Sequence, residues 1–199
     1  RNGGTLTVEN TTISGNTSLT NDGGGIESSG FMSLTNVTVT GNSADDFGGG
    51  LFNSGTATLT NTIVLGNTAT TSSEIEGTFT DGGGNVVTGS VADVFASIDG
   101  STGGGLVADN GGPVQTAALA NDPAHPALAV GSGSIEDARG ETRVDMGLGG
   151  NEGANFADAG AYELVCFATG TRIASAEKEV AVEDIKIGDS VLCADGVET

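Results

Sequence analysis

The chain has very few positive charges and very few aromatic rings. It contains 6 Lys and Arg against 26 Asp and Glu, a formal net charge of −20, and neither Lys nor Arg between Asn2 and Ala138. Because so acidic a surface repels phosphate groups, we expect neither nucleic acid nor an anionic membrane as a partner. The sequence has no Trp and one Tyr, Tyr162, so the repeat region lacks the rings that sugar-binding platforms favour.

Long apolar runs and cysteine clusters are missing as well. No run approaches a membrane span and no signal peptide is visible, and since Arg1 is not a natural start we expect an internal piece of an exported protein. The two cysteines, Cys166 and Cys193, lack metal-type spacing, which excludes a zinc site and a disulfide framework. Cys193 is interpreted as a small buried residue, with a Cys166–Cys193 disulfide as the alternative.

A repeat of about 25 residues organises the first part of the chain. Its equivalent asparagines, Asn10, Asn36 and Asn61, lie 26 and then 25 residues apart, a period typical of solenoids. Within each repeat, Thr or Ser alternates with Val, Ile or Leu, which is a strand pattern. The predicted fold class is therefore all-β, a right-handed parallel β-helix with about one rung per repeat.

The recurrence of asparagine at one position of each repeat has a structural explanation on this fold. Leu34 and Asn36 share one side of the strand, whereas Val37 and Val39 have the opposite parity. A bend at Asn36 returns both apolar sets to the interior, and asparagine tolerates the left-handed backbone of such a corner. On rungs about 4.8 Å apart, these side chains are also placed to form an amide ladder.

Triplets of glycine recur at the same period, at Gly23–Gly25 and Gly48–Gly50. They predict another corner, or a place where rungs pack closely, in preference to a phosphate cradle, because no lysine follows them. The next residues begin with Ile26 and Leu51, so the carboxylate of a calcium-binding nonapeptide is missing. We expect no cofactor and no dedicated metal site, with incidental calcium binding as the one metal contact left open.

A longer set of motifs extends from Thr58 to Glu163. In order, its main members are Leu106, Asp109–Pro113, Gln115–Thr116, Pro126–Ala127, Asp137–Gly140, Arg143, Asp145 and Ala159–Glu163. This set resembles the end of bacterial choice-of-anchor Q surface proteins, which are β-helical. Ala124–Ala129 departs from that family's pattern, and so does a Gly-rich insertion after Met146. Together, the repeat period and this resemblance imply β-helix repeats over residues 1–107 and a capping or anchor-type segment over residues 108–165.

A second set of motifs begins at Cys166. It consists of Cys166–Ile173, reading Cys-Phe-Ala-Thr-Gly-Thr-Arg-Ile, then Val182–Ile185 and Gly188–Leu192. These motifs resemble the opening of a Hint domain, the autoprocessing fold of Hedgehog C-terminal regions and inteins. The resemblance covers residues 166–199, the first strands of such a β domain, and is specific because the three motifs fall within about 30 residues.

The Hint resemblance implies a reaction at Val165–Cys166. In that family the cysteine sulfur attacks the preceding carbonyl, here that of Val165, and an N-to-S acyl shift leaves a thioester. Thr169, Gly170 and Thr171 match the family's opening turn and are expected to shape the loop around the junction. The family's Thr-x-x-His proton donor does not occur before Thr199, so we expect self-cleavage of the full-length protein and not of residues 1–199 alone.

Carbohydrate chemistry is the alternative, with a polysaccharide-degrading or polysaccharide-binding β-helix and a merely structural Hint-like segment. A lyase needs an Arg or Lys base, which residues 2–138 lack. A hydrolase needs two carboxylates flanking a cleft. The only adjacent acidic pair in the repeats, Asp45–Asp46, is interpreted as part of a solvated loop.

The remaining charged residues have structural interpretations. Asp137, Arg139, Arg143 and Asp145 predict a capping network of ion pairs and turns, and His125 lies between prolines in a surface loop. The sequence thus predicts an adhesin-like bacterial protein, extracellular or at the cell surface. Its expected partners are a cell-surface or glycan ligand and the downstream remainder of its own Hint domain, with no nucleic acid and no membrane span.

Overall fold

A computed structural model of the chain describes residues 1–20, 22–120, 126–127, 136–141, 158–164, 172–174 and 179–181. The chain divides into two compact units, Arg1–Leu164 and Val165–Thr199. The described residues are mostly β, with one short helix. Among them, no helix has the length and apolar character needed to cross a membrane.

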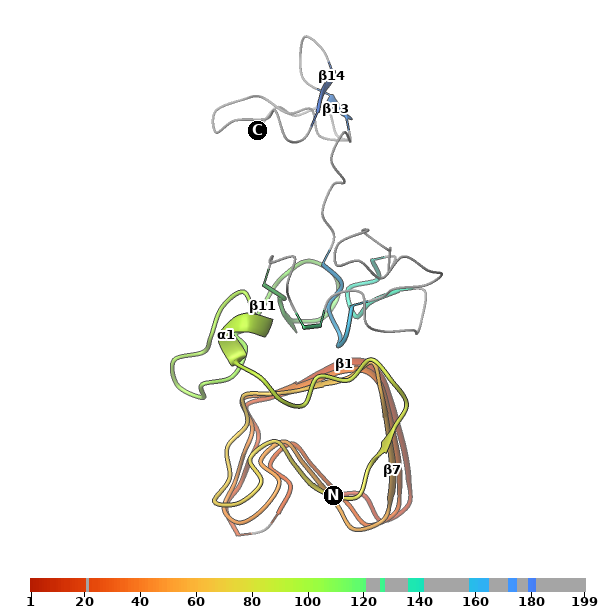
Figure 1. Ribbon diagram of the computed structural model, residues 1–199, viewed down its shortest axis with the longest axis vertical. Coiled ribbons are helices and arrows are strands. Elements are labelled where there is room, and N and C mark those ends of the chain that lie inside the picture. Colours follow the sequence, from red (N-terminus) through yellow and green to blue (C-terminus); the bar gives the residue numbers. More distant parts are fainter. Residues whose placement is uncertain are drawn as a thin grey trace. The chain divides into compact units, whose positions relative to one another are not determined.

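Unit 1 is built around a parallel β-solenoid of about 3 turns in residues 5–81. Figure 1 looks along the coil, so that successive rungs overlie one another. The largest sheet holds β1 (Thr5–Ser14), β4 (Phe31–Thr40), β7 (Thr56–Thr60), β8 (Ile63–Val64) and β10 (Thr80–Asp81). Two further sheets of the coil hold β3 (Ile26–Ser28), β6 (Leu51–Asn53) and β9 (Ile75–Gly77), and β2 (Thr17–Ser18) with β5 (Ser43–Ala44).

The strands pair in the register that the repeats predict. Val8 lies opposite Leu34, and Leu34 opposite Leu59, each one rung further along the solenoid. Each repeat therefore forms one rung, and like residues stack on like. The predicted parallel β-solenoid is confirmed.

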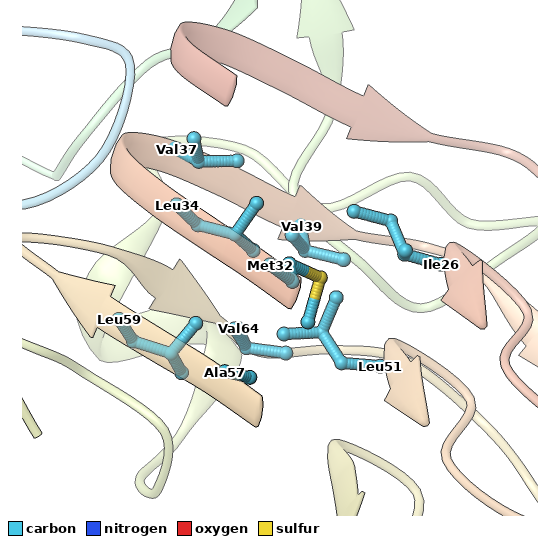
Figure 2. Close-up of a cluster of buried hydrophobic side chains, with 9 residues drawn as sticks. All are labelled: Ile26, Met32, Leu34, Val37, Val39, Leu51, Ala57, Leu59 and Val64. Atoms are coloured by element: carbon cyan, nitrogen blue, oxygen red, sulfur yellow. The ribbon is translucent and has the colours of Figure 1, made fainter. Parts of the chain in front are cut away.

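The interior of the coil is a column of aliphatic side chains. Its buried members, shown in Figure 2, are Ile26, Met32, Leu34, Val37, Val39, Leu51, Ala57, Leu59 and Val64. In the first half of β4 and along β7 they alternate with partly or fully exposed Ser and Thr residues, as a sheet with one buried face requires. Removal of this apolar surface from water is the main contribution to the stability of the coil.

The predicted asparagine corner is also confirmed. Asn10, Asn36 and Asn61 have φ values of 46°, 54° and 52°, in the left-handed region. At Asn36 the bend turns Val37 and Val39 inward, so that both are fully buried. The side-chain amide of Asn61 donates to the side-chain carbonyl of Asn36, which makes the predicted ladder contact between these two rungs.

The glycine triplets combine both predicted roles. Gly23 and Gly48 have φ values of +69° and +62° and form corners. Gly24 and Gly49 instead lie where rungs pack closely. A Cβ on Gly24 would be 2.3 Å from the carbonyl oxygen of Gly49, and one on Gly49 would be 2.2 Å from that of Thr68. Only glycine fits there.

A second layer covers one outer side of the coil. It includes α1 (Val91–Val94) and the antiparallel pair β11 (Val107–Ala108) and β12 (Thr116–Ala117). The Oγ1 atoms of Thr38 and Thr40 accept hydrogen bonds from the N–H groups of Ala161 and Gly105, at 3.0 Å and 2.8 Å. These outward-facing threonines are consequently buried. Figure 1 shows α1 and β11 outside the coil.

In unit 2, the structure describes one antiparallel pair of strands. β13 (Arg172–Ala174) pairs with β14 (Glu179–Ala181), and Ile173 lies opposite Val180. The pair begins directly after Thr171, the last residue of the predicted opening turn.

Candidate functional site

The residues predicted to carry the processing chemistry lie outside the part of the chain that the structure describes. These are Val165, Cys166, Thr169, Gly170 and Thr171. The same holds for Cys193 and for the loop residue His125. The structure does describe the residues that lead to the predicted scissile bond, Asp158–Leu164, which we call the anchored segment.

The backbone of the anchored segment is held by hydrogen bonds along almost its whole length. Its N–H donors and their acceptors are Asp158 to Glu163 Oε2 (2.9 Å), Ala159 to the carbonyl of Ala127 (2.8 Å), Gly160 to the carbonyl of Asn61 (2.8 Å), Ala161 to Thr38 Oγ1 (3.0 Å), Glu163 to Asp137 Oδ2 (3.0 Å) and Leu164 to Asp158 Oδ2 (2.8 Å). Two of these acceptors belong to the asparagine corner and to β4. The segment is thus fastened to the solenoid itself.

A buried ion pair fixes the C-terminal end of the anchored segment. Arg139 contacts Asp137 with Nη2 and Nε both 2.7 Å from Oδ2, and the side chains are 9% and 0% exposed. The guanidinium also donates from Nη2 to the carbonyl of Glu163 at 2.6 Å. It lies over the ring of Tyr162, 3.9 Å from its centroid. We call Asp137, Arg139, Tyr162 and Glu163 the Arg139 clamp.

Asp137 also organises the turn in which it lies. Its Oδ1 accepts from the N–H groups of Arg139 at 2.8 Å and Glu141 at 3.1 Å. The predicted network of ion pair and turn is therefore confirmed for Asp137 and Arg139. Arg143 and Asp145, the other two predicted members, lie outside the described residues.

Three buried carboxylates lie in this region, those of Asp137, Asp158 and Glu163, and the first of them pairs with the Arg139 guanidinium. Each accepts at least one backbone N–H from the anchored segment. Such bonds compensate the desolvation of a buried charge. Across the described ranges, no group of three or more His, Cys, Asp or Glu side chains is arranged to hold a metal ion. The network is suited to positioning a chain, because its carboxylates are engaged by backbone N–H groups.

Asp45 and Asp46, the acidic pair considered for hydrolysis, are exposed in a turn after β5. Thr70, one rung further along, donates to the carbonyl of Asp45 at 2.7 Å. This placement agrees with the solvated-loop interpretation.

No family model, no curated protein and no solved structure matches this chain. The likeness to Hint domains and to choice-of-anchor Q proteins therefore depends on the sequence motifs that carry it.

Sequence reasoning missed the extent of the anchored segment. The motif Ala159–Glu163 was visible, but its contacts with Asn61 and Thr38 join residues about 100 or more positions apart. It also missed a second ladder at Asn16, Asn42 and Asn67. A signal was present there, since a Gly-Asn pair recurs at this point of every repeat.

Proposed function

We propose that this chain is the carrier, with the first part of the processing module, of a bacterial surface protein that cleaves itself between Val165 and Cys166. The observation that supports this function is the position of the boundary. Unit 1 ends at Leu164, and the proposed scissile bond follows after one residue. Cleavage at this place would release unit 1 as a complete folded unit.

The proposed step is an N-to-S acyl shift. The sulfur of Cys166 forms a bond to the carbonyl carbon of Val165, the C–N bond of the peptide breaks, and the thiol proton ends on the freed amine of Cys166. The products are a thioester and an α-amine, with no oxidant or reductant involved. Thiolate is the attacking form, and donors aimed at the developing oxyanion lower the barrier.

The carrier itself is proposed to be an adhesin-like structural module at the cell surface. Its rungs stack parallel strands into a solenoid, and its acidic composition favours solubility and disfavours phosphate-bearing partners. The alternative, turnover of a polysaccharide by the solenoid, would depend on acidic residues of the repeats and be indifferent to Cys166.

The test is the intact mass of the complete protein, incubated with and without hydroxylamine. We expect two fragments that part between Val165 and Cys166, formed faster when hydroxylamine is present because it attacks thioesters. Cys166→Ala should abolish this cleavage, while Cys193→Ala, the matched control, should retain it. Continued cleavage of the Cys166→Ala protein would overturn the mechanism, and an uncleaved wild-type chain would direct attention to the solenoid.

A further inference from the structure

We infer that the carrier binds ice through an outward-facing array of hydroxyl groups on its largest sheet. The array lies where β1, β4, β7 and β10 pair ahead of the asparagine corner. Its members, which we call the hydroxyl face, are Thr5, Thr7, Ser33, Thr35, Thr56, Thr58, Thr60 and Thr80. This inference goes beyond the proposed self-cleavage, because it involves none of the residues after Leu164.

The register of the strands gives the hydroxyl face two regular spacings. One column of hydroxyl groups runs unbroken through the four strands, in the order Thr7, Ser33, Thr58 and Thr80. In the column beside it, Thr35 lies opposite Thr60. Neighbouring strands are about 4.8 Å apart, and successive residues on one face of a strand are about 6.6 Å apart. The hydroxyl groups are therefore arranged as a two-dimensional grid.

The hydroxyl face is open to solvent, whereas the sheet beyond the corner is covered. All its members are partly or fully exposed. Beyond the corner, Thr38 and Thr40 are buried beneath the second layer, and their hydroxyl groups accept N–H groups from it. Figure 1 shows the strands on the β7 side of the coil overlying one another, as they do in a sheet with little twist. Because threonine is also stiff at χ1, the grid is flat and rigid.

Ice is the ligand whose chemistry fits this grid. A hydroxyl group both donates and accepts hydrogen bonds, as each water molecule of ice does, whereas a carboxylate only accepts and an ammonium group only donates. On the prism faces of hexagonal ice, water oxygens repeat in two perpendicular directions. One repeat is slightly shorter than the spacing between rungs, and the other is slightly longer than the spacing along a strand. The hydroxyl groups can therefore replace ice waters, while the threonine methyl groups order the water around them.

Two positions of the grid hold other side chains. Phe31, which is 44% exposed, lies between Thr5 and Thr56. Glu9 is exposed and lies opposite Thr35 in the first rung. A single ring is not a platform on which a polysaccharide chain stacks, and a single carboxylate is not a site for a cationic polymer. The grid thus favours ice over a glycan or a charged polymer, and these two side chains should limit its affinity for ice.

The experiment measures how the complete protein partitions between liquid and a slowly growing ice crystal, together with its thermal hysteresis. We expect the wild type to be enriched in the ice and to separate the freezing point from the melting point. Thr58→Tyr places a bulky ring in the middle of the unbroken column. Because this ring holds the ice surface away from the neighbouring hydroxyl groups, the substitution should abolish both effects.

Two further variants show whether the hydroxyl face is the cause. Thr88→Tyr is the matched control, since Thr88 is exposed in a loop outside the sheet, and it should bind ice as the wild type does. Phe31→Thr places a hydroxyl group between Thr5 and Thr56 and so completes a further column. This variant should increase the thermal hysteresis. Urea unfolding of each variant establishes that it is folded under the conditions of the ice measurements.

The outcomes separate this inference from the proposed function. Wild-type protein that stays in the liquid overturns ice binding and leaves self-cleavage intact. Ice binding that persists in folded Thr58→Tyr, or that is lost in folded Thr88→Tyr, overturns the hydroxyl face as its site. Folded Phe31→Thr without a larger hysteresis overturns the role of the grid. Capture by insoluble cellulose but not by ice would assign the face to a glycan. Ice binding by a complete protein that does not cleave would overturn the proposed function alone.

Discussion

The side-chain amide of Asn67 donates a hydrogen bond of 2.8 Å to Oε2 of Glu74, and this contact ends a ladder of stacked asparagines. In the earlier rungs the acceptor is another asparagine, since Asn16 donates to Asn42 and Asn42 to Asn67, each at 2.9 Å. Glu74 occupies the place that the next asparagine would take. Its carboxylate also accepts the N–H groups of Gly66 and Asn67, at 2.9 Å and 3.2 Å.

The first prediction concerns the pH dependence of stability. Burial raises the pKa of Glu74 above 4.5, although the hydrogen bonds from Asn67 and Gly66 act in the opposite direction. A raised pKa in the folded state means that Glu74 contributes stability below its unfolded pKa and loses that contribution as pH rises through its folded pKa. As pH rises from about 4 to neutral, the free energy of unfolding of the wild type should therefore fall relative to that of Glu74→Gln. Urea unfolding at each pH measures this difference.

Asp81 is the control for this experiment, because its shift has the opposite sign. Hydrogen bonds from the N–H of Gly83 and the side chain of Asn85 lower its pKa below 3.8. Asp81 therefore contributes stability above its unfolded pKa, and that contribution is lost as pH falls through its folded pKa. The wild type should be more stable than Asp81→Asn at neutral pH, and this difference in the free energy of unfolding should shrink as the pH is lowered. If the stability difference between variant and wild type changed with pH in the same direction for both variants, this account would be contradicted.

The second prediction separates the two roles of the corner asparagine. Asn36→Ala places a side chain that disfavours φ of 54° at this corner, at a cost of about 1–2 kcal/mol. It also leaves the buried amide of Asn61 without its Asn36 acceptor, which costs about 1–3 kcal/mol more. Asn36→Gly restores the backbone freedom but not the acceptor. Denaturant unfolding should place the Gly variant between the wild type and the Ala variant, and equal stabilities of the two variants would show that the backbone term is negligible.

The corner at Asn36 also shows what could be predicted from the sequence. Parity alone required a bend there, because Leu34 and Val37 both have to face the interior, and asparagine is suited to such a bend. The repeat period then fixed the register of the rungs. These features depend on local pattern, which a single sequence contains in full.

The features that could not be predicted depend on contacts between distant residues. Glu74 follows Asn67 by only 7 positions, so the repeat period gives no sign that it continues the ladder of Asn16, Asn42 and Asn67. The contact of Ala161 with Thr38 spans 123 positions, and an outward threonine on a strand gives no sign that it will be covered. For the processing residues after Leu164, the Hint resemblance remains a prediction.

The third prediction tests the interior column. Leu34 is fully buried between Val8 and Leu59 of the adjoining rungs, so Leu34→Ala removes packed methyl groups and leaves a cavity. We expect a loss of about 2–5 kcal/mol in the free energy of unfolding. Leu19, which is 78% exposed, is the control, and Leu19→Ala should change stability by less than about 0.5 kcal/mol. Similar losses at both positions would mean that the coil does not pack as described.

The fourth prediction concerns the Arg139 clamp. Arg139→Ala removes the guanidinium from the fully buried carboxylate of Asp137 and also ends the contact with Tyr162. An uncompensated buried charge is costly, so we expect a loss of about 3–5 kcal/mol in the free energy of unfolding of unit 1. Arg139→Lys keeps the charge but not the planar guanidinium, and its free energy of unfolding should lie between those of the Ala variant and the wild type.

Arg1 supplies the control for the clamp experiment. It also forms an ion pair, with Glu27 at 3.1 Å, but its side chain is 75% exposed. Because exposed pairs are screened by water, Arg1→Ala should cost less than about 1 kcal/mol. Urea unfolding of the complete protein, with hydrogen exchange at Glu163 and Leu164 as a local readout, should show lost protection in Arg139→Ala alone. Full protection of these two amides in that variant would mean that the anchored segment is held without the clamp, by its contacts with Asn61, Thr38 and Asp158.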